Sequence, residues 1–258
     1  STVARLEMVL SCEATLIFCT PSYALHMAEV AADNDIDLAS SRVRCIIVAG
    51  EPGGSIPSVR ERIENAWCAR VVDHSGASEV GPWGYADREG YGLHVVESEF
   101  IAEFLPVADE DASENRHQLS ELVLTSLGRA GCPLIRYRTG DLVRPAYDSQ
   151  QANRFVFLEG GVLGRTDDMM IVRGVNVFPS SIEQILHTFP EIAEYRLIAH
   201  KQGEMDALTI ELEDELAAPQ RVAKALRLRL GLRVEIKLVP VGSLPRFEGR
   251  GQRFVDRR

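Results

Sequence analysis

The stretch that decides the fold covers residues 43–72 and reads VRCIIVAGEPGGSIPSVRERIENAWCARVV. An apolar run, Val43–Ala49, ends at a loop that contains three glycines. Ser58–Trp67 carries its charges on one side, which predicts a helix, and Ala69–Val72 is the next apolar run. A strand, a crossover helix and a second strand in this rhythm are typical of a parallel sheet.

The same rhythm begins upstream of this stretch. Thr15–Cys19 reads as a buried strand that ends at Thr20-Pro21, and Tyr23–Ala32 has helical spacing. In an open α/β sheet, ligands bind beyond the carboxyl ends of the strands. We therefore expect the candidate site in three stretches that follow apolar strands and are rich in glycine, polar and charged residues: Ala49–Gly54, Asp73–Pro82 and Cys132–Asp141.

The pattern changes twice after Gly84. Short strand-like pieces separated by turns predict an antiparallel, barrel-like subdomain, in which the acidic segment Val107–Gln118 is an exposed loop. These pieces are Leu93–Val96, Phe100–Leu105, Glu121–Thr125, Leu134–Tyr137, Leu142–Pro145 and Arg154–Leu158.

A third pattern starts near Gly164 and predicts a small α+β domain. Ser180 or Ser181 is expected to cap a helix over Ile182–Thr188, with Glu183 in its first turn. The other expected elements are the strand Met169–Val172, the hairpin Tyr195–His200 with Ala207–Glu213, the helix Pro219–Leu230 and the strand Val234–Pro240. The predicted organisation is α/β for residues 1–85, barrel-like for 86–166 and small α+β for 167–258.

Composition excludes several classes of protein. A formal net charge of −10 over 258 residues argues against a nucleic-acid-binding protein. Only Lys201, Lys224 and Lys237 are lysines, so a GxxxxGK[ST] phosphate loop is excluded from the first 200 residues. An odd five cysteines without CxxC spacing indicate free thiols in a reducing, cytoplasmic setting. We expect no membrane span and no signal peptide, and the start in mid-pattern suggests a cut chain.

Two common catalytic arrangements do not fit. The segment Gly76–Val80 lacks the second glycine of a GxSxG elbow, and Asp73, His74 and Ser75 are chain neighbours, whereas a catalytic triad converges in space. The six histidines show neither HExxH spacing nor cysteine pairing, so a zinc site is not indicated.

One long motif carries a family resemblance. The stretch GRTDDMMIVRGVNVFPSSIE, residues 164–183, resembles the adenylate-forming ligases and, within them, the phenylacetate–coenzyme A ligase group. Further matching stretches occur in the same order along nearly the whole chain, although they cover only the later part of the family's length. They are Cys19–Leu25, Gly50–Pro52, Ser78–Val80, Ile135–Asp141 and Leu244–Arg250.

The resemblance implies an enzyme that activates a carboxylic acid with ATP to an acyl-adenylate and passes the acyl group to coenzyme A. It makes Glu79 the Mg²⁺-binding carboxylate and Ser78 the hydroxyl near the α-phosphate. Ser75 and Gly76 precede them in the same motif and would be cofactor-binding positions. Asp141 would hold the ribose hydroxyls, with Arg165 nearby. The remaining implied roles are Gly50, Glu51 and Pro52 at the adenine and acyl pockets, Asp167 as hinge of a mobile small domain, Gly174 near the coenzyme A path and Arg250 at the catalytic lysine position.

Departures from the family pattern keep alternatives open. The phosphate loop upstream of these motifs is absent, Ser75 replaces the aromatic residue that stacks on adenine, and Arg250 replaces a lysine with a wider, planar cation. The chain is therefore expected to be part of an acyl- or aryl-acid–coenzyme A ligase with little activity by itself. The alternatives are a catalytically silent protein that binds a nucleotide or acyl-coenzyme A, and an adenylating enzyme with another acceptor. Tyr23, Trp83 and Tyr85 hint at an aromatic acid, and a homodimer is left open.

Overall fold

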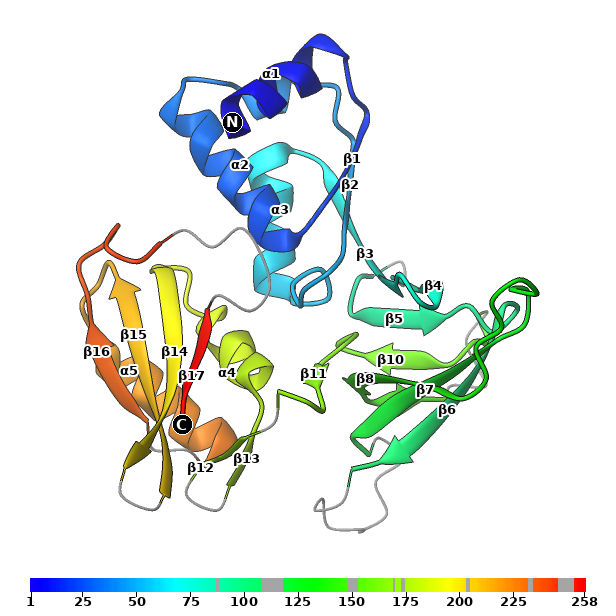
Figure 1. Ribbon diagram of the computed structural model, residues 1–258. Helices are drawn as coiled ribbons and strands as arrows, with labels where there is room; N and C mark the ends of the chain where they lie inside the picture. The colour runs from blue at the N-terminus through cyan, green and yellow to red at the C-terminus, as the bar shows by residue number, and fades with distance from the viewer. Residues whose placement is uncertain are drawn as a thin grey trace. The chain divides into compact units, whose positions relative to one another are not determined.

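The computed structural model forms two compact units, Ser1–Thr166 and Asp167–Arg258, which are described separately (Figure 1). The described residues are 1–86, 89–107, 118–147, 153–168, 170–172, 175–202, 205–231, 234–245 and 253–258. None of the helices among these residues is long and apolar enough to cross a membrane.

A three-stranded parallel sheet opens the first unit. Its strands pair in chain order, so the right-handed crossovers place both connecting helices on one face, as Figure 1 shows. The indole N–H of Trp67 donates to the Ala24 carbonyl at 3.0 Å and ties the two helices together. The elements are α1 (Thr2–Ser11), β1 (Leu16–Cys19), α2 (Pro21–Asp33), η1 (Leu38–Ser40), β2 (Cys45–Val48), α3 (Pro57–Trp67) and β3 (Arg70–Ala77).

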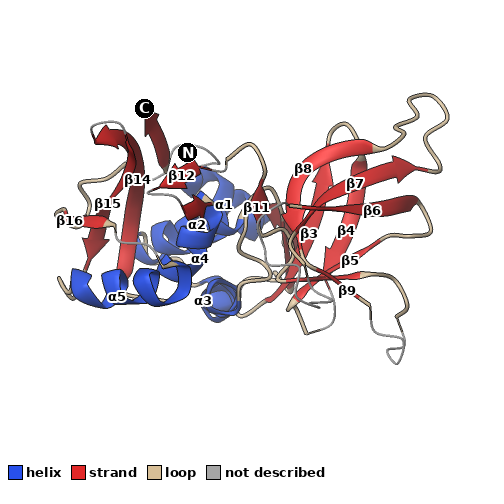
Figure 2. Ribbon diagram, turned by 90° about the horizontal axis from the view of Figure 1, so that it is seen from below, coloured by secondary structure: helices blue, strands red, loops and turns tan. Residues whose placement is uncertain are grey.

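Antiparallel strands extend this sheet to seven, in the order β1-β2-β3-β4-β5-β10-β9, and a separate four-stranded sheet has the order β11-β8-β7-β6 (Figure 2). One apolar cluster, which includes Trp83, Leu93, Leu122 and Leu158, draws side chains from both antiparallel regions. The strands are β4 (Gly81–Ala86), β5 (Gly92–Val95), β6 (Phe100–Pro106), β7 (Ser120–Ser126), β8 (Tyr137–Val143), β9 (Pro145–Ala146), β10 (Phe157–Glu159) and β11 (Gly164–Arg165).

The second unit is built on a four-stranded sheet of order β16-β15-β14-β17, in which the long central pair is antiparallel and both outer strands run parallel to their neighbours. Its apolar core includes Ile182, Leu197, Ile210, Val222 and Leu226. The elements are β12 (Met170–Val172), β13 (Val175–Val177), α4 (Pro179–Leu186), β14 (Ile192–Gln202), β15 (Met205–Asp214), α5 (Pro219–Leu230), β16 (Glu235–Leu238) and β17 (Phe254–Arg257).

The predicted fold class, a parallel α/β region, an antiparallel region and a small α+β region, is confirmed. Two local predictions are wrong. The expected loop over His74–Gly84 is the β3–β4 hairpin, because the strands pair antiparallel up to a short turn. Ser180 and Ser181 lie inside α4, which begins at Pro179, and Phe178 is its N-cap without a side-chain bond. Proline is favoured at the first helical position because its fixed φ suits the helix and its missing N–H would go unbonded there.

Other sequence expectations have different outcomes. The helix Thr2–Ser11 and the strand Phe254–Arg257 were not predicted. The expected exposed loop Val107–Gln118 lies largely outside the described residues, which end at 107 and resume at 118.

Candidate functional site

The loops that follow β1 and β2 are joined by one carboxylate. Glu51 Oε1 accepts the Ser22 backbone N–H at 2.6 Å, at the amino terminus of α2. A negative charge is stabilised there by the exposed N–H groups and the dipole of the helix. Burial, together with the nearby Glu51, raises the pKa of the Cys19 thiol to about 11. Glu51, which was expected to border the ligand pockets with Gly50 and Pro52, therefore also fixes the spacing of two strand ends.

A second link joins the β2 loop to β3. The Ser55 hydroxyl donates to Asp73 Oδ2 at 2.5 Å, and the His74 backbone N–H donates to the other carboxylate oxygen at 3.0 Å. Burial is the main cause that raises the pKa of Asp73. A Cβ at Gly54 would lie 2.6 Å from the Cβ of Asp73, so only glycine allows this approach. Asp73 begins one of the candidate stretches and Ser55 directly follows another, but neither residue was given a role of its own, and their contact was not predicted.

The hairpin that follows β3 carries the next predicted residues. Ser75 and Gly76 lie in β3, where the pairing register with β4 shifts between them, and such bulges re-aim side chains. Ser78 and Glu79 lie in the exposed turn. The Arg129 guanidinium donates to the backbone carbonyl of Glu79, so a residue that sequence reasoning missed holds the main chain of this turn.

Asp141 and Arg165 are brought together on the other sheet of the first unit. They are direct partners across β8 and β11, and Arg165 Nη1 lies 3.3 Å from Asp141 Oδ1. The Asp141 backbone N–H donates to Thr139 Oγ1 at 3.0 Å. Gly140 has a φ of +75°, a conformation that favours glycine, and a Cβ there would also push the Arg165 guanidinium, whose Nη2 would lie 2.9 Å away.

Donors for a metal ion are sparse. Within the part of the chain that the structure describes, no group of three or more His, Cys, Asp or Glu side chains could hold a metal by itself. Glu79 is thus one exposed carboxylate on a turn. Magnesium is usually bound through one or two carboxylates together with phosphate oxygens of a substrate, so a single carboxylate fits Mg²⁺ but not a closed protein site.

Three predicted residues belong to the second unit. Asp167 is its first residue and is exposed. Gly174 and Arg250 lie outside the described residues. In the first unit, Gly50–Pro52 follow β2, and Ser75–Glu79 follow the part of β3 that pairs with β2, since Val48 pairs with Asp73. The structure thus gathers these two groups at one end of the sheet and forms the Asp141–Arg165 pair separately.

Comparison with family models finds a match to the AMP-binding enzyme C-terminal domain over residues 174–258. Among curated proteins, the phenylacetate-coenzyme A ligase of Escherichia coli is 30% identical over 100% of this chain and 61% of its own length. The phenylacetate-coenzyme A ligase of Thermus thermophilus is 29% identical over 91% of this chain and 58% of its own. The chain therefore spans about three fifths of the length of these relatives.

Solved structures agree with this result. A 2-hydroxyisobutyryl-CoA ligase in the postadenylation state, in complex with an acyl-AMP (R3-HIB-AMP), matches with a TM-score of 0.88. It is 26% identical and covers 100% of this chain and 57% of its own. An anthranilate CoA ligase in complex with anthranoyl-AMP is 19% identical with a TM-score of 0.64, over 96% of this chain and 50% of its own, and it supports the fold alone.

Proposed function

The chain is homologous over its whole length to the AMP-binding, adenylate-forming ligases, and from this premise we propose that it binds an acyl-adenylate and takes part in joining a carboxylic acid to coenzyme A. The observation that carries the proposal is the structural match of the entire chain to a ligase that holds an acyl-AMP. We expect an aromatic acid, since phenylacetate-coenzyme A ligases are among the relatives.

The proposed reaction has two half-reactions. An oxygen of the acid attacks the α-phosphorus of ATP, the bond to the β-phosphate breaks, and pyrophosphate leaves. The thiolate of coenzyme A then attacks the acyl carbonyl, and AMP leaves with the bonding electron pair. The first step is needed because a carboxylate is a poor electrophile, and adenylation gives it a good leaving group.

The residues of the first unit suit the adenylate. The Asp141 carboxylate, oriented by Arg165 and by the glycine at position 140, can accept hydrogen bonds from a ribose diol. Ser78 and Glu79 would lie near the α-phosphate, with Gly50, Glu51 and Pro52 beside the adenine and the acyl group. Glu79 would hold Mg²⁺, which offsets phosphate charge when bound.

The second unit would serve the second half-reaction. Asp167 would be the hinge at which this unit turns, Gly174 would lie near coenzyme A, and Arg250 would supply a cation to the reacting phosphate and acyl group. A hinge allows one pocket to serve two half-reactions with different groups.

Calorimetric titration with an aryl-acyl sulfamoyladenosine, a stable acyl-adenylate analogue, tests the proposal. We expect binding that weakens at least about tenfold in Asp141→Asn and in Glu79→Gln, which corresponds to about 1.4 kcal/mol. Glu103→Gln is the matched control, because Glu103 pairs with Arg136 at an exposed position of the same unit. Absence of binding, or equal binding by all variants, would refute the proposed site.

A second candidate is a catalytically silent homologue that keeps only the binding function. It is favoured by Ser75, which stands where relatives have a stacking aromatic residue, and by Arg250 in place of a lysine. The two candidates differ in AMP release that depends on ATP, acid and coenzyme A. Binding of the analogue without such AMP release would favour the silent homologue, and release at an ordinary enzymatic rate would eliminate it.

A further inference from the structure

The loop that follows β2, residues 50–55, has an accessible half and a buried half. Residues 50–52, to which the proposed function gives contacts with the ligand, are exposed or half-buried. Residues 53–55 are buried. The two halves are continuous in the chain, so whatever fixes the buried half also limits where the accessible half can lie.

Close backbone contacts fix the buried half of this β2 loop. A Cβ at Gly53 would lie 2.6 Å from the Cβ of Pro21, the first residue of α2. A Cβ at Gly54 would lie 2.6 Å from both Asp73 Cβ and Val48 Cγ2. The loop backbone therefore lies directly against side chains of α2, β2 and β3, and only glycine allows both approaches.

Asp73 supplies the hydrogen bonds of the buried half. Its Oδ2 accepts the Ser55 hydroxyl at 2.5 Å, and the carboxyl group also bonds to the Ser55 backbone N–H. The Ser55 Oγ is packed closely, because a Cβ at Gly161 would lie 3.0 Å from it. A hydroxyl can donate to a carboxylate or accept from a carboxylic acid, so this contact can form in either protonation state of Asp73.

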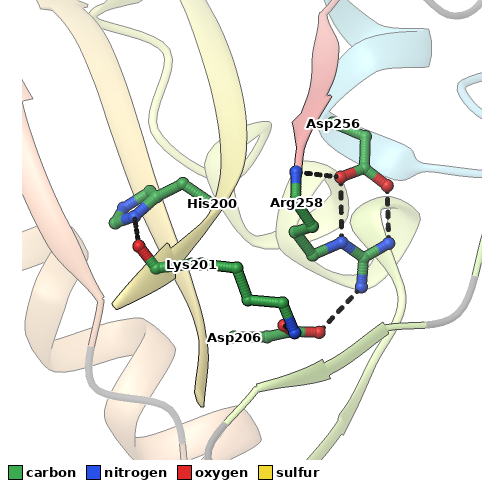
Figure 3. Close-up of polar contacts among 5 residues, drawn as sticks. All are labelled: His200, Lys201, Asp206, Asp256 and Arg258. Atoms are coloured by element: carbon green, nitrogen blue, oxygen red, sulfur yellow. Dashed lines mark hydrogen bonds and ion pairs between the residues drawn. The ribbon is translucent and has the colours of Figure 1, made fainter. Parts of the chain in front are cut away.

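The donors of Asp73 differ from those of a carboxylate that belongs to an ion pair. Figure 3 shows such a carboxylate in the second unit, where Asp206 accepts Arg258 at 3.0 Å and pairs with Lys201 at 2.5 Å. The hydrogen bond from Lys201 is the main cause that lowers the pKa of Asp206. Asp73 receives a hydroxyl and backbone N–H groups instead. Since a buried charge is costly unless it is paired, stability alone does not explain an aspartate at this position.

The accessible half is tied at its other side. Glu51 Oε1 accepts the Ser22 backbone N–H at 2.6 Å, near the start of α2. The β2 loop is thus bonded to β3 through Ser55 and to α2 through Glu51. Movement of one attachment is expected to change the other, because only three residues separate Glu51 from Ser55.

We propose that Asp73, acting through Ser55, is a positioning residue that holds the β2 loop in the conformation in which residues 50–52 contact the acyl-adenylate. The inference rests on the proposed function, which gives residues 50–52 these contacts. A loop that is already held in its binding conformation loses less conformational entropy when the ligand binds, and this favours affinity.

Amide hydrogen exchange in the full chain tests the positioning without any ligand. We expect Ser55→Ala to accelerate exchange of the Ser22 amide at least about fivefold, because the loop that carries its acceptor, Glu51, loses an attachment. Ser120→Ala is the matched control: Ser120 is 3% exposed, and its hydroxyl donates to the Gln118 carbonyl at 3.1 Å, in the other sheet of the same unit. Unchanged Ser22 exchange in Ser55→Ala, or equal acceleration in Ser120→Ala, would overturn the proposal.

Affinity for the aryl-acyl sulfamoyladenosine tests whether the positioning reaches the ligand. We expect Asp73→Ala and Ser55→Ala each to weaken binding at least about fivefold, and Ser120→Ala to change it less than twofold. Asp73→Asn should restore most of the affinity, since its amide can donate to Ser55 and accept the His74 N–H. Ser55→Ala removes a single side-chain bond, so it serves if Asp73→Ala does not fold.

The two readouts separate this inference from the proposed function. Full affinity in Ser55→Ala, together with a loss in Glu79→Gln, would overturn the inference while the proposed site stands. Accelerated Ser22 exchange in Ser55→Ala, together with no binding of the analogue by the wild type, would support the attachment of the loop and contradict the proposed function.

Discussion

Two buried aspartates, one in each unit, have pKa values that are shifted in opposite directions. Asp73 in β3 is 8% exposed, and Asp214 at the end of β15 is 6% exposed. Asp73 receives a hydroxyl and backbone N–H groups, and burial raises its pKa. Burial also opposes ionisation of Asp214, but the N–H groups of Ala218 and Leu216 and the guanidinium of Arg221 outweigh it and lower the pKa.

The difference lies in the donors. Asp214 joins β15 to the start of α5, because it binds the Ala218 N–H and the Arg221 side chain, and it is built to stay charged. Asp73 is bonded instead by a hydroxyl and by the main chain, and it lies where the β2 and β3 loops meet. A buried carboxylate with a raised pKa in a cleft is a common feature of functional sites. We therefore expect Asp214 to serve stability, while Asp73 lies beside the proposed binding residues.

Removal of Asp214 should have the largest effect. Asp214→Ala leaves the N–H groups of Leu216 and Ala218 without their acceptor and leaves Arg221 with Glu191 alone, so we expect a loss of about 3 kcal/mol in the free energy of unfolding of the second unit. Hydrogen exchange of the β15 amides in urea measures it. Glu215→Ala, at the exposed neighbouring position, should stay within about 0.5 kcal/mol. A loss below about 1 kcal/mol would show that Asp214 is not a main source of stability in the second unit.

Removal of the Ser55 hydroxyl should have the second-largest effect on stability. Ser55→Ala takes a donor from the buried Asp73, and we expect a loss of about 1 to 2 kcal/mol in the first unit. Tryptophan fluorescence during urea unfolding reports on this unit, because both tryptophans, Trp67 and Trp83, belong to it. In a cycle with Asp73→Asn, equal losses from Ser55→Ala in both backgrounds would show that the hydroxyl does not act through the carboxylate.

The pH dependence of stability should have opposite signs at the two aspartates. Because the pKa of Asp214 is lowered, its ionised carboxylate stabilises the folded state at pH values above the ordinary pKa of 3.8. This contribution to the free energy of unfolding is lost as pH falls through the lower pKa of the folded state. Because the pKa of Asp73 is raised, its protonated form stabilises the folded state, and this contribution to the free energy of unfolding is complete below pH 3.8. It is lost as pH rises through the higher pKa of the folded state. Stability of the wild type minus that of each Asp→Asn variant, measured from pH 3 to 7, should rise for Asp214 and fall for Asp73. Equal signs would contradict the comparison.

The partly exposed pair Asp141–Arg165 should matter least for stability. We expect Arg165→Gln to cost at most about 0.5 kcal/mol, because an ion pair in contact with solvent contributes little. Affinity for the acyl-adenylate analogue should nevertheless fall about tenfold, since the Asp141 carboxylate loses the group that orients it. A stability loss above about 2 kcal/mol with unchanged affinity would make this pair structural, like Asp214.

The elements that the sequence predicted well are those with local patterns. β1, β2 and the helices after them follow apolar runs and helical spacing. α1 was missed although Val3, Leu6 and Leu10 recur at helical spacing and Leu6 is buried. β17 is a short strand, Phe254–Arg257, that exists through its pairing with β14, more than fifty residues earlier. The first unit ends at Thr166 and the second begins at Asp167, and the hinge role of Asp167 remains a prediction.

The candidate site likewise has residues that the sequence predicted and contacts that it did not. Motifs led to Glu51, Glu79, Asp141 and Arg165, because their neighbours in sequence form recognisable loops. The partners were not foreseeable: Ser22 for Glu51, Arg129 for the Glu79 carbonyl and Ser55 for Asp73. Each of these contacts joins residues at least eighteen positions apart, beyond the range of turns and helices.

The sequence alone determined the family resemblance, the three successive patterns of secondary structure and the positions of the candidate residues, because periodicity and motifs are local properties of the chain. Only the tertiary structure decided which carboxylates are buried and what donates to them. It shifted the pKa values of Asp73 and Asp214 in opposite directions, and it placed Glu194 directly opposite Glu213 across β14 and β15. The physical reason is that a carboxylate's charge depends on its solvation and its donors, and both are supplied by distant parts of the chain once the sheets have formed.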